Sequence, residues 1–257
     1  MSDPLYVPPP APVPGSVTPQ QVLAPTASAP MPAYGAYASP YGVPPAVGFR
    51  GPWGAAPLRA PLGLGVATIV LAAVWTALQF VSLATSFDAA DQYAAAAAAG
   101  TSVFKVNTAY DGLGLLTGPV TVAAYVVGCL WLQDSRRFAE VVAPAVRQTR
   151  GRVWVWLGWV VPVVSFWFPY QVVRDVAAGT GARVRSTLGW WWASWLVAQW
   201  LAGQASFLAA GWGSRDPSTL PTFEMCATAA TVGGFILWVR IVRAVSAGQR
   251  ARLATIG

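Results

Sequence analysis

The sequence predicts an all-α protein, a polytopic bundle of transmembrane helices preceded by a disordered N-terminal tail. Hydrophobic residues make up 55% of the 257 residues and charged residues only 10%, whereas soluble domains average about 25% charged residues. Five apolar runs follow residue 61, and each approaches the ~20 residues that a helix needs to cross the hydrocarbon core. The first 61 residues hold sixteen of the 22 prolines. The bilayer is therefore the expected solvent of everything after the tail.

Residues 1–60 form the predicted tail, and residues 61–257 form the predicted helical membrane domain. Proline fixes φ and removes a hydrogen-bond donor, so the tail is expected to form neither helix nor sheet. A Pro-x-x-P match lies at Pro9–Pro12, and polyproline II segments of this kind bind aromatic-lined grooves. Two interpretations stay open: a solvated spacer, or a docking tail for a cytosolic protein partner.

Four of the apolar runs are predicted to span the membrane as helices. Their ranges are 62–85, 112–133, 188–212 and 222–239. The third is rich in tryptophan, and only Glu224 interrupts the fourth, near its start. Between the first two spans the alanine run Ala94–Ala99 favours helix, so we expect a helical extension or a short surface helix there. The last helix is expected to continue beyond Val239.

The fifth apolar run, Val153–Val173, is long enough to span but contains Pro162 and Pro169. With four spans and an internal N-terminus, fourteen basic residues lie inside and two outside. A fifth span would divide them eight and eight. Because basic residues prefer the cytoplasmic side, the count predicts a segment that enters the membrane and returns on the same side.

The same count places both termini of this multi-pass protein in the cytoplasm. Arginine outnumbers lysine fifteen to one and alanine is abundant, a composition typical of GC-rich coding, so we expect the bacterial plasma membrane. The net charge is +7, but the basic residues flank apolar segments and form no separate basic domain, so nucleic acid is not an expected partner. Anionic lipid headgroups are the expected partner of these flanks. Four arginines after the last span, Arg240, Arg243, Arg250 and Arg252, suit that role.

The string Trp167-Phe168-Pro169-Tyr170-Gln171, followed by Arg174-Asp175, resembles a family of actinobacterial multi-pass membrane proteins catalogued as a domain of unknown function. The run Arg136-Arg137-Phe138-Ala139-Glu140 looks like the preceding block of that family. The resemblance covers roughly residues 60–250, and members often carry a proline-rich tail. It implies a membrane fold, and it brings no activity, cofactor or catalytic residue.

The residue types disfavour an enzyme. Histidine is absent and lysine occurs once, so neither a catalytic triad nor a common metal site can be assembled in a familiar way. None of the nine acidic residues falls in the middle of a predicted span, where carboxylates usually mark ion or proton coupling. We therefore predict no catalytic residue, no cofactor and no metal.

One cluster stands out as a candidate functional or interface site, at the end of the broken segment. If a helix begins at Pro169, Tyr170 with Arg174 and Gln171 with Asp175 become i,i+4 neighbours. The cluster is a ligand or partner contact, or it anchors the segment, with Arg174 on lipid phosphate and Asp175 balancing an arginine. Its members are Pro162, Trp167, Pro169, Tyr170, Gln171, Arg174 and Asp175.

Mildly polar residues also occur inside the predicted spans. They either form hydrogen bonds between helices or line a small polar cavity. Gly114 and Gly118, and Gly233 with Gly234, would permit close helix approach. The polar residues are Thr76, Gln79, Ser82, Thr121, Tyr125, Gln199, Gln204 and Ser206.

Two functions are compatible with this sequence. The first is a non-enzymatic component of the cell envelope whose tail recruits partners. The second is a small transporter or channel component in which the broken segment shapes a pore or binding site, as discontinuous helices do in transporters. A cavity reaching Gln199 and Gln204 would favour the second.

Overall fold

The computed structural model describes residues 58–211 and 216–256, and this part of the chain is helical without strands. Most of the predicted tail, residues 1–57, lies outside the described residues. The long helices are α1 (Leu62–Ala98), α2 (Ala109–Val142), α5 (Arg185–Ala209) and α6 (Leu220–Ile256). The shorter elements are α3 (Trp154–Leu157), α4 (Phe168–Thr180) and three 3-10 turns at Val103–Lys105, Val164–Phe166 and Pro217–Thr219.

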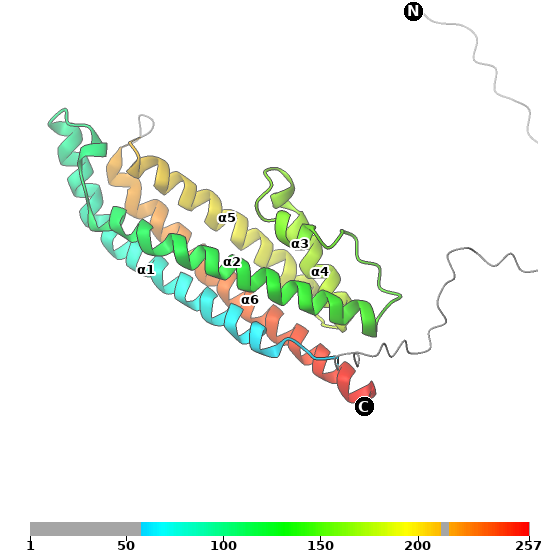
Figure 1. Ribbon diagram of the computed structural model, residues 1–257. Helices are drawn as coiled ribbons and strands as arrows, with labels where there is room; N and C mark the ends of the chain where they lie inside the picture. The colour runs from blue at the N-terminus through cyan, green and yellow to red at the C-terminus, as the bar shows by residue number, and fades with distance from the viewer. Residues whose placement is uncertain (1–57, 212–215, 257) are drawn as a thin grey trace, which may run out of the picture. The chain divides into compact units, whose positions relative to one another are not determined.

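The four long helices lie side by side, with α3 and α4 beside α2 and α5 at one end (Figure 1). Helices α2 and α6 end there and α5 begins there. We call this the arginine-rich end, because Arg136 and Arg137 of α2, Arg185 of α5, and Arg250 and Arg252 of α6 lie in these terminal parts of the helices. Helix α1 packs on α2 and on α6, and α6 packs on α5. By contrast, α2 makes at most marginal contact with α5. The bundle is therefore open along one side, and only at the arginine-rich end does α4 bridge it.

Within the described ranges, three helical segments are long and apolar enough to cross a membrane: α1, α2 and residues 217–256. They contain the predicted spans 62–85, 112–133 and 222–239. Helix α5 covers most of the predicted span 188–212 and is about 37 Å long at ~1.5 Å per residue. It does not match the other three in apolar character, because tryptophans, glutamines and serines replace aliphatic residues along it.

The predicted helical extensions are confirmed. Helix α1 continues through the alanine run to Ala98, and α6 continues past Val239 to Ile256. Helix α2 begins at a capping box, in which Thr108 accepts from the backbone of Asp111 and the Asp111 carboxylate accepts from the Thr108 backbone. This cap satisfies backbone donors that the first helical turn leaves free.

The fifth apolar run does not form one helix. It contains α3, a tight turn, a 3-10 turn and the start of α4. Pro169 occupies the first turn of α4, where its missing N–H costs no helical hydrogen bond. Before it, the Val164 amide donates to the Pro162 carbonyl at 2.8 Å around Val163 at φ 68° and ψ −58°, the geometry of a γ-turn.

Side chains of α2 and α5 satisfy the backbone of this broken segment. Tyr125 and Cys129 of α2 donate to the carbonyls of Trp156 and Val155, at 3.0 and 3.2 Å. From α5, the Trp192 indole donates to the Phe166 carbonyl at 2.8 Å. Because lipid cannot satisfy free backbone groups, these bonds are what an irregular segment between apolar helices requires.

Two glycines bring α4 close to its neighbours. A Cβ on Gly248 of α6 would lie 2.5 Å from the Thr180 carbonyl oxygen, and one on Gly179 would lie 2.6 Å from Ala139 of α2. The glycines singled out in the sequence behave differently. Gly233 and Gly234 face Ser194 of α5 as expected, whereas Gly114 and Gly118 face open space. The close approach predicted for Gly114 and Gly118 is wrong, because no other helix packs against their side of α2.

Candidate functional site

The predicted cluster on α4 is divided by the structure. Pro162 and Trp167 are exposed, whereas Pro169 is buried and Tyr170 packs against the core. Gln171, Arg174 and Asp175 form polar contacts with one another or with the loop between α2 and α3.

Buried Asp175 is the centre of these contacts. Its carboxylate accepts from the Thr149 backbone amide at 2.7 Å and from the Arg174 guanidinium at 2.9 Å. Arg174 also donates to the Thr149 hydroxyl, and Arg150 donates to Gln171 at 2.6 Å. The Arg150 guanidinium lies 4.0 Å above the Phe168 ring. The partners are thus in the loop, and the cluster fastens residues 149–150 to α4.

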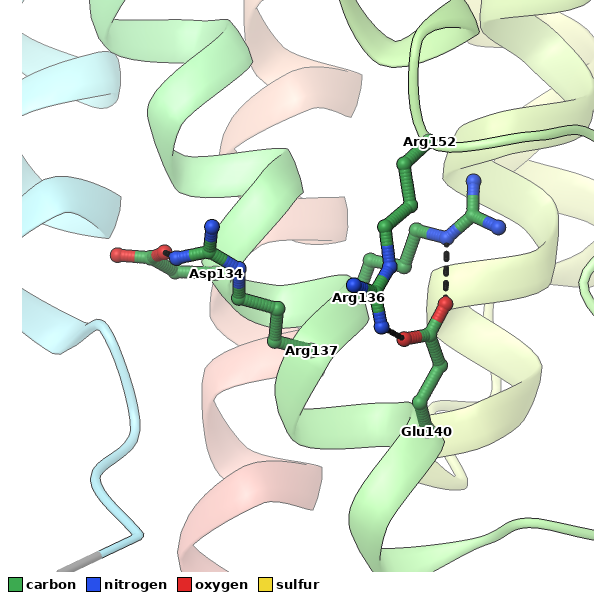
Figure 2. Close-up of polar contacts among 5 residues, drawn as sticks. All are labelled: Asp134, Arg136, Arg137, Glu140 and Arg152. Carbon is green, nitrogen blue, oxygen red and sulfur yellow. Dashed lines mark hydrogen bonds and ion pairs between the residues drawn. The ribbon is translucent and has the colours of Figure 1, made fainter. Parts of the chain in front are cut away.

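A second polar cluster, centred on Glu140, lies at the arginine-rich end. Glu140 accepts from Arg136 at 2.8 Å and from Arg152 at 2.6 Å, as Figure 2 shows. Arg136 is buried, so its charge needs this partner. The hydrogen bond to Glu140 raises the pKa of Arg152, which stays cationic. The outlying pair Arg137–Asp134 is exposed, and such pairs contribute little.

A cavity of about 490 Å³ lies between the four long helices. On α5 and α6 it separates two hydrophobic cores. One core at the arginine-rich end includes Trp191 and Ile241, and the other, at the opposite end, includes Leu208 and Leu220. The lining residues of α5 and α6 fall within 191–202 and 230–238. The cavity therefore occupies the middle of the bundle.

The exposed lining residues locate its mouth. They are Thr121 and Val122 of α2, Val160 of the broken segment and Gln199 of α5. The remaining lining residues, from all four helices, are buried or half-buried. The cavity thus opens sideways between α2 and α5, the pair of helices that do not pack together, and the broken segment contributes Trp159 and Val160 to its lining.

Five of the eight polar residues noted in the predicted spans line this cavity: Thr76, Gln79, Thr121, Tyr125 and Gln199. Gln204 is not among the lining residues. The cavity interpretation is therefore supported for the middle of the helices. No lining residue is charged.

Tryptophan forms much of the wall, with Trp75, Trp159, Trp191, Trp195 and Trp238 among the lining residues. Trp191 stacks on Trp238 with ring centroids 5.1 Å apart, and Trp159 meets Trp195 edge to face at 5.9 Å. These contacts hold the rings in place. The Trp159 indole nitrogen is buried and has no hydrogen-bond partner among the described residues, which is unusual for such a group.

The polar centre that sequence reasoning missed is Glu224. It is 3% exposed and accepts from Gln79 of α1 at 2.7 Å and from Tyr110 of α2 at 2.6 Å. In the sequence it stands out only as the one charge that interrupts the fourth apolar run, near the start of that run. The available signal was Gln79 in the first span, because a buried carboxylate needs donors and an amide can supply one.

The chain belongs to the family described as Domain of unknown function (DUF4328), whose model matches residues 96–247. The match begins near the end of α1 and extends into α6, so it includes the broken segment, the α4 cluster and most of the cavity wall. Searches of curated proteins and of solved structures find no significant match.

Proposed function

We propose that this protein is a non-enzymatic membrane protein that binds a hydrophobic small molecule from the bilayer in the cavity between α1, α2, α5 and α6. The sideways opening between α2 and α5 carries this proposal. A cavity that opens between helices at the level of the hydrocarbon is entered from lipid, and apolar, aromatic-lined cavities with a few polar groups are typical ligand sites. Such a site suits a transporter or channel component.

The topology proposed with it has four spans, α1, α2, α5 and α6, with both termini cytoplasmic. The count of basic residues supports this arrangement, and so does the length of α5. The segment 153–173 then enters from the cytoplasmic side and returns, and its prolines support the break. Its Trp159 and Val160 line the cavity, and the unpaired Trp159 indole would donate to an oxygen of the ligand.

Contact quenching tests this function, because bromine quenches tryptophan fluorescence at short range. A brominated long-chain alcohol is titrated into the detergent-purified full-length protein. Saturable quenching is expected, since the wall holds five tryptophans. Ala202→Phe, which fills the cavity, should abolish the saturable part. Val197→Phe, on the exposed face of the same helix, is the matched control and should leave it intact. Quenching that stays saturable in both variants would refute the proposal.

A second role rests on the proline-rich tail. The Pro-x-x-P match at Pro9–Pro12 supports recruitment of a cytosolic partner. The test compares capture of proteins by full-length protein and by a chain with alanine at Pro9 and Pro12. A partner retained by the first and lost by the second supports the role, and equal retention argues for a spacer.

A further inference from the structure

The chemistry around Glu224 narrows the class of ligand. This buried carboxylate lies in the first turns of α6, one of the segments apolar enough to cross a membrane. Its two oxygens accept from two neutral donors, Gln79 and Tyr110. Among the described residues, no cation pairs with it. An ionisable side chain inside an apolar helix bundle normally either pairs with a group of opposite charge or has a functional role.

Gln79 connects this carboxylate to the cavity. Its side chain lines the cavity, and its amide nitrogen lies 2.7 Å from Glu224. Thus Glu224 stands one side chain behind the cavity wall. No lining residue carries a charge of either sign, so a ligand beside Gln79 would lie in the field of Glu224 with no charged side chain in the wall to offset it. At low dielectric its field discriminates strongly between ligand charges.

The tryptophans of the cavity wall favour a positively charged ligand. Trp75 lies one helical turn before Gln79 on α1, and four more tryptophans, from α5, α6 and the broken segment, also line the cavity. The faces of tryptophan rings attract cations, most strongly where water is excluded. An aromatic wall with a carboxylate one side chain behind it complements a molecule with an apolar body and a positive charge.

We propose, resting on the proposed cavity function, that the ligand is a lipophilic organic cation and that Glu224 is the residue that selects its charge. The cation lies against Gln79 and within the field of Glu224, and its apolar groups lie among the tryptophans. Neutral amphiphiles fit the same cavity but gain nothing from Glu224, and lipophilic anions are excluded.

Tetraphenylphosphonium and tetraphenylborate form the probe pair, because they share one shape and differ in the sign of their charge. Each is used to compete with the brominated alcohol on the detergent-purified full-length protein. We expect tetraphenylphosphonium to displace the alcohol and tetraphenylborate to leave it bound. Competition by the borate equal to that by the phosphonium overturns the charge selection without any variant.

Glu224→Gln then tests the residue itself. The Gln79 amide can turn to present its oxygen to the new amide, so the helix contacts are retained. Affinity for tetraphenylphosphonium, measured by equilibrium dialysis, should fall at least tenfold, and Glu224→Asp should retain most of it. Asp88→Asn, at an exposed carboxylate of α1, is the control and should bind as the parent does.

The alcohol titration separates the two proposals. If Glu224→Gln still binds the alcohol saturably and loses the phosphonium, both proposals stand. If it binds both as the parent does, the cation inference is wrong and the cavity function stands. If the parent protein binds neither probe saturably, the cavity function fails and the cation inference fails with it.

Discussion

At the scale of single residues, the polar groups of this protein serve two different purposes. At the arginine-rich end, Asp175 accepts hydrogen bonds from a loop amide and an arginine, and Glu140 accepts hydrogen bonds from two arginines. Glu224 instead is held by neutral donors. The first kind of arrangement satisfies charges that would otherwise be buried alone. The second leaves a charge without a counterpart in the described residues, which is why the ligand inference concerns Glu224.

Asp175→Asn should destabilise the protein. The new amide cannot accept from both Thr149 and Arg174 as the carboxylate does, and losing a buried charged acceptor costs about 1–3 kcal/mol. The midpoint of thermal unfolding in detergent measures the change. Asp134→Asn, which breaks the exposed pair with Arg137 (Figure 2), should change stability by less than about 0.5 kcal/mol. Equal effects would contradict an anchoring role for Asp175.

Val163→Gly should stabilise the protein. Val163 holds φ at 68°, a region that β-branched residues avoid at a cost of about 1–3 kcal/mol. Its side chain is 62% exposed, so little packing is lost, and glycine's greater chain entropy offsets part of the gain. We expect a net increase of about 1 kcal/mol. The same thermal assay measures it, with Val153→Gly, at φ −61°, as a control that should destabilise.

At the scale of elements, the broken segment connects helices that otherwise do not pack together. It bridges α2 and α5 at the arginine-rich end and contributes Trp159 and Val160 to the lining of the cavity. Its α4 is held by close approaches at Gly179 and Gly248. Small residues at such crossings let backbones approach within van der Waals distance. Moving α4 outward should therefore also displace the two lining residues, Trp159 and Val160, that precede it in the same segment.

Gly248→Ala should lower stability by about 1–3 kcal/mol, the usual cost of overpacking. The added Cβ would lie 2.5 Å from the Thr180 carbonyl oxygen, and a backbone atom cannot turn aside. Gly114→Ala is the control, because that position meets open space in a helix and alanine raises helix propensity by up to about 1 kcal/mol. The midpoint of thermal unfolding should fall in Gly248→Ala and rise in Gly114→Ala. A shift of the same sign would show that the α4–α6 contact is not tight.

At the scale of the whole molecule, the open side between α2 and α5 defines what the bundle can do. Three helix interfaces are packed, and the fourth is replaced by α4 at one end and by the cavity mouth in the middle. A closed four-helix bundle would fill its centre with side chains. Here the cavity lies between two separate cores instead.

The proposed topology makes a prediction at this scale. In a Cys226→Ala background, with Cys129 buried, new cysteines at Ser102 and Ser186 report on the two ends of the bundle. A membrane-impermeant maleimide applied to intact cells should label the Ser102→Cys protein only. The Ser186→Cys protein should react after permeabilisation, because residues after the broken segment are cytoplasmic in the four-span arrangement. Labelling of Ser186→Cys from outside would instead indicate five spans.

Composition and local pattern were sufficient for the elements. Proline positions predicted the break in 153–173, and the alanine run predicted helix after the first span, which the structure forms as an extension of α1. These features depend on backbone restrictions that act within a few residues. The contacts of the α4 cluster could not be predicted in this way. Gln171 and Asp175 pair with residues 21 and 26 positions away in the chain, and no local periodicity encodes such partners.

The sequence by itself thus determined that this is a helical protein with segments apolar enough to cross a membrane and with a broken fifth apolar run, because hydrophobicity and proline act locally. Only the tertiary structure decided which side of the bundle stays open and which polar residues meet there. Gln79, Tyr110 and Glu224 come from three helices, and their meeting depends on how those helices are rotated and aligned. That arrangement results from packing over the whole bundle, so the cavity and its carboxylate became visible only in the folded chain.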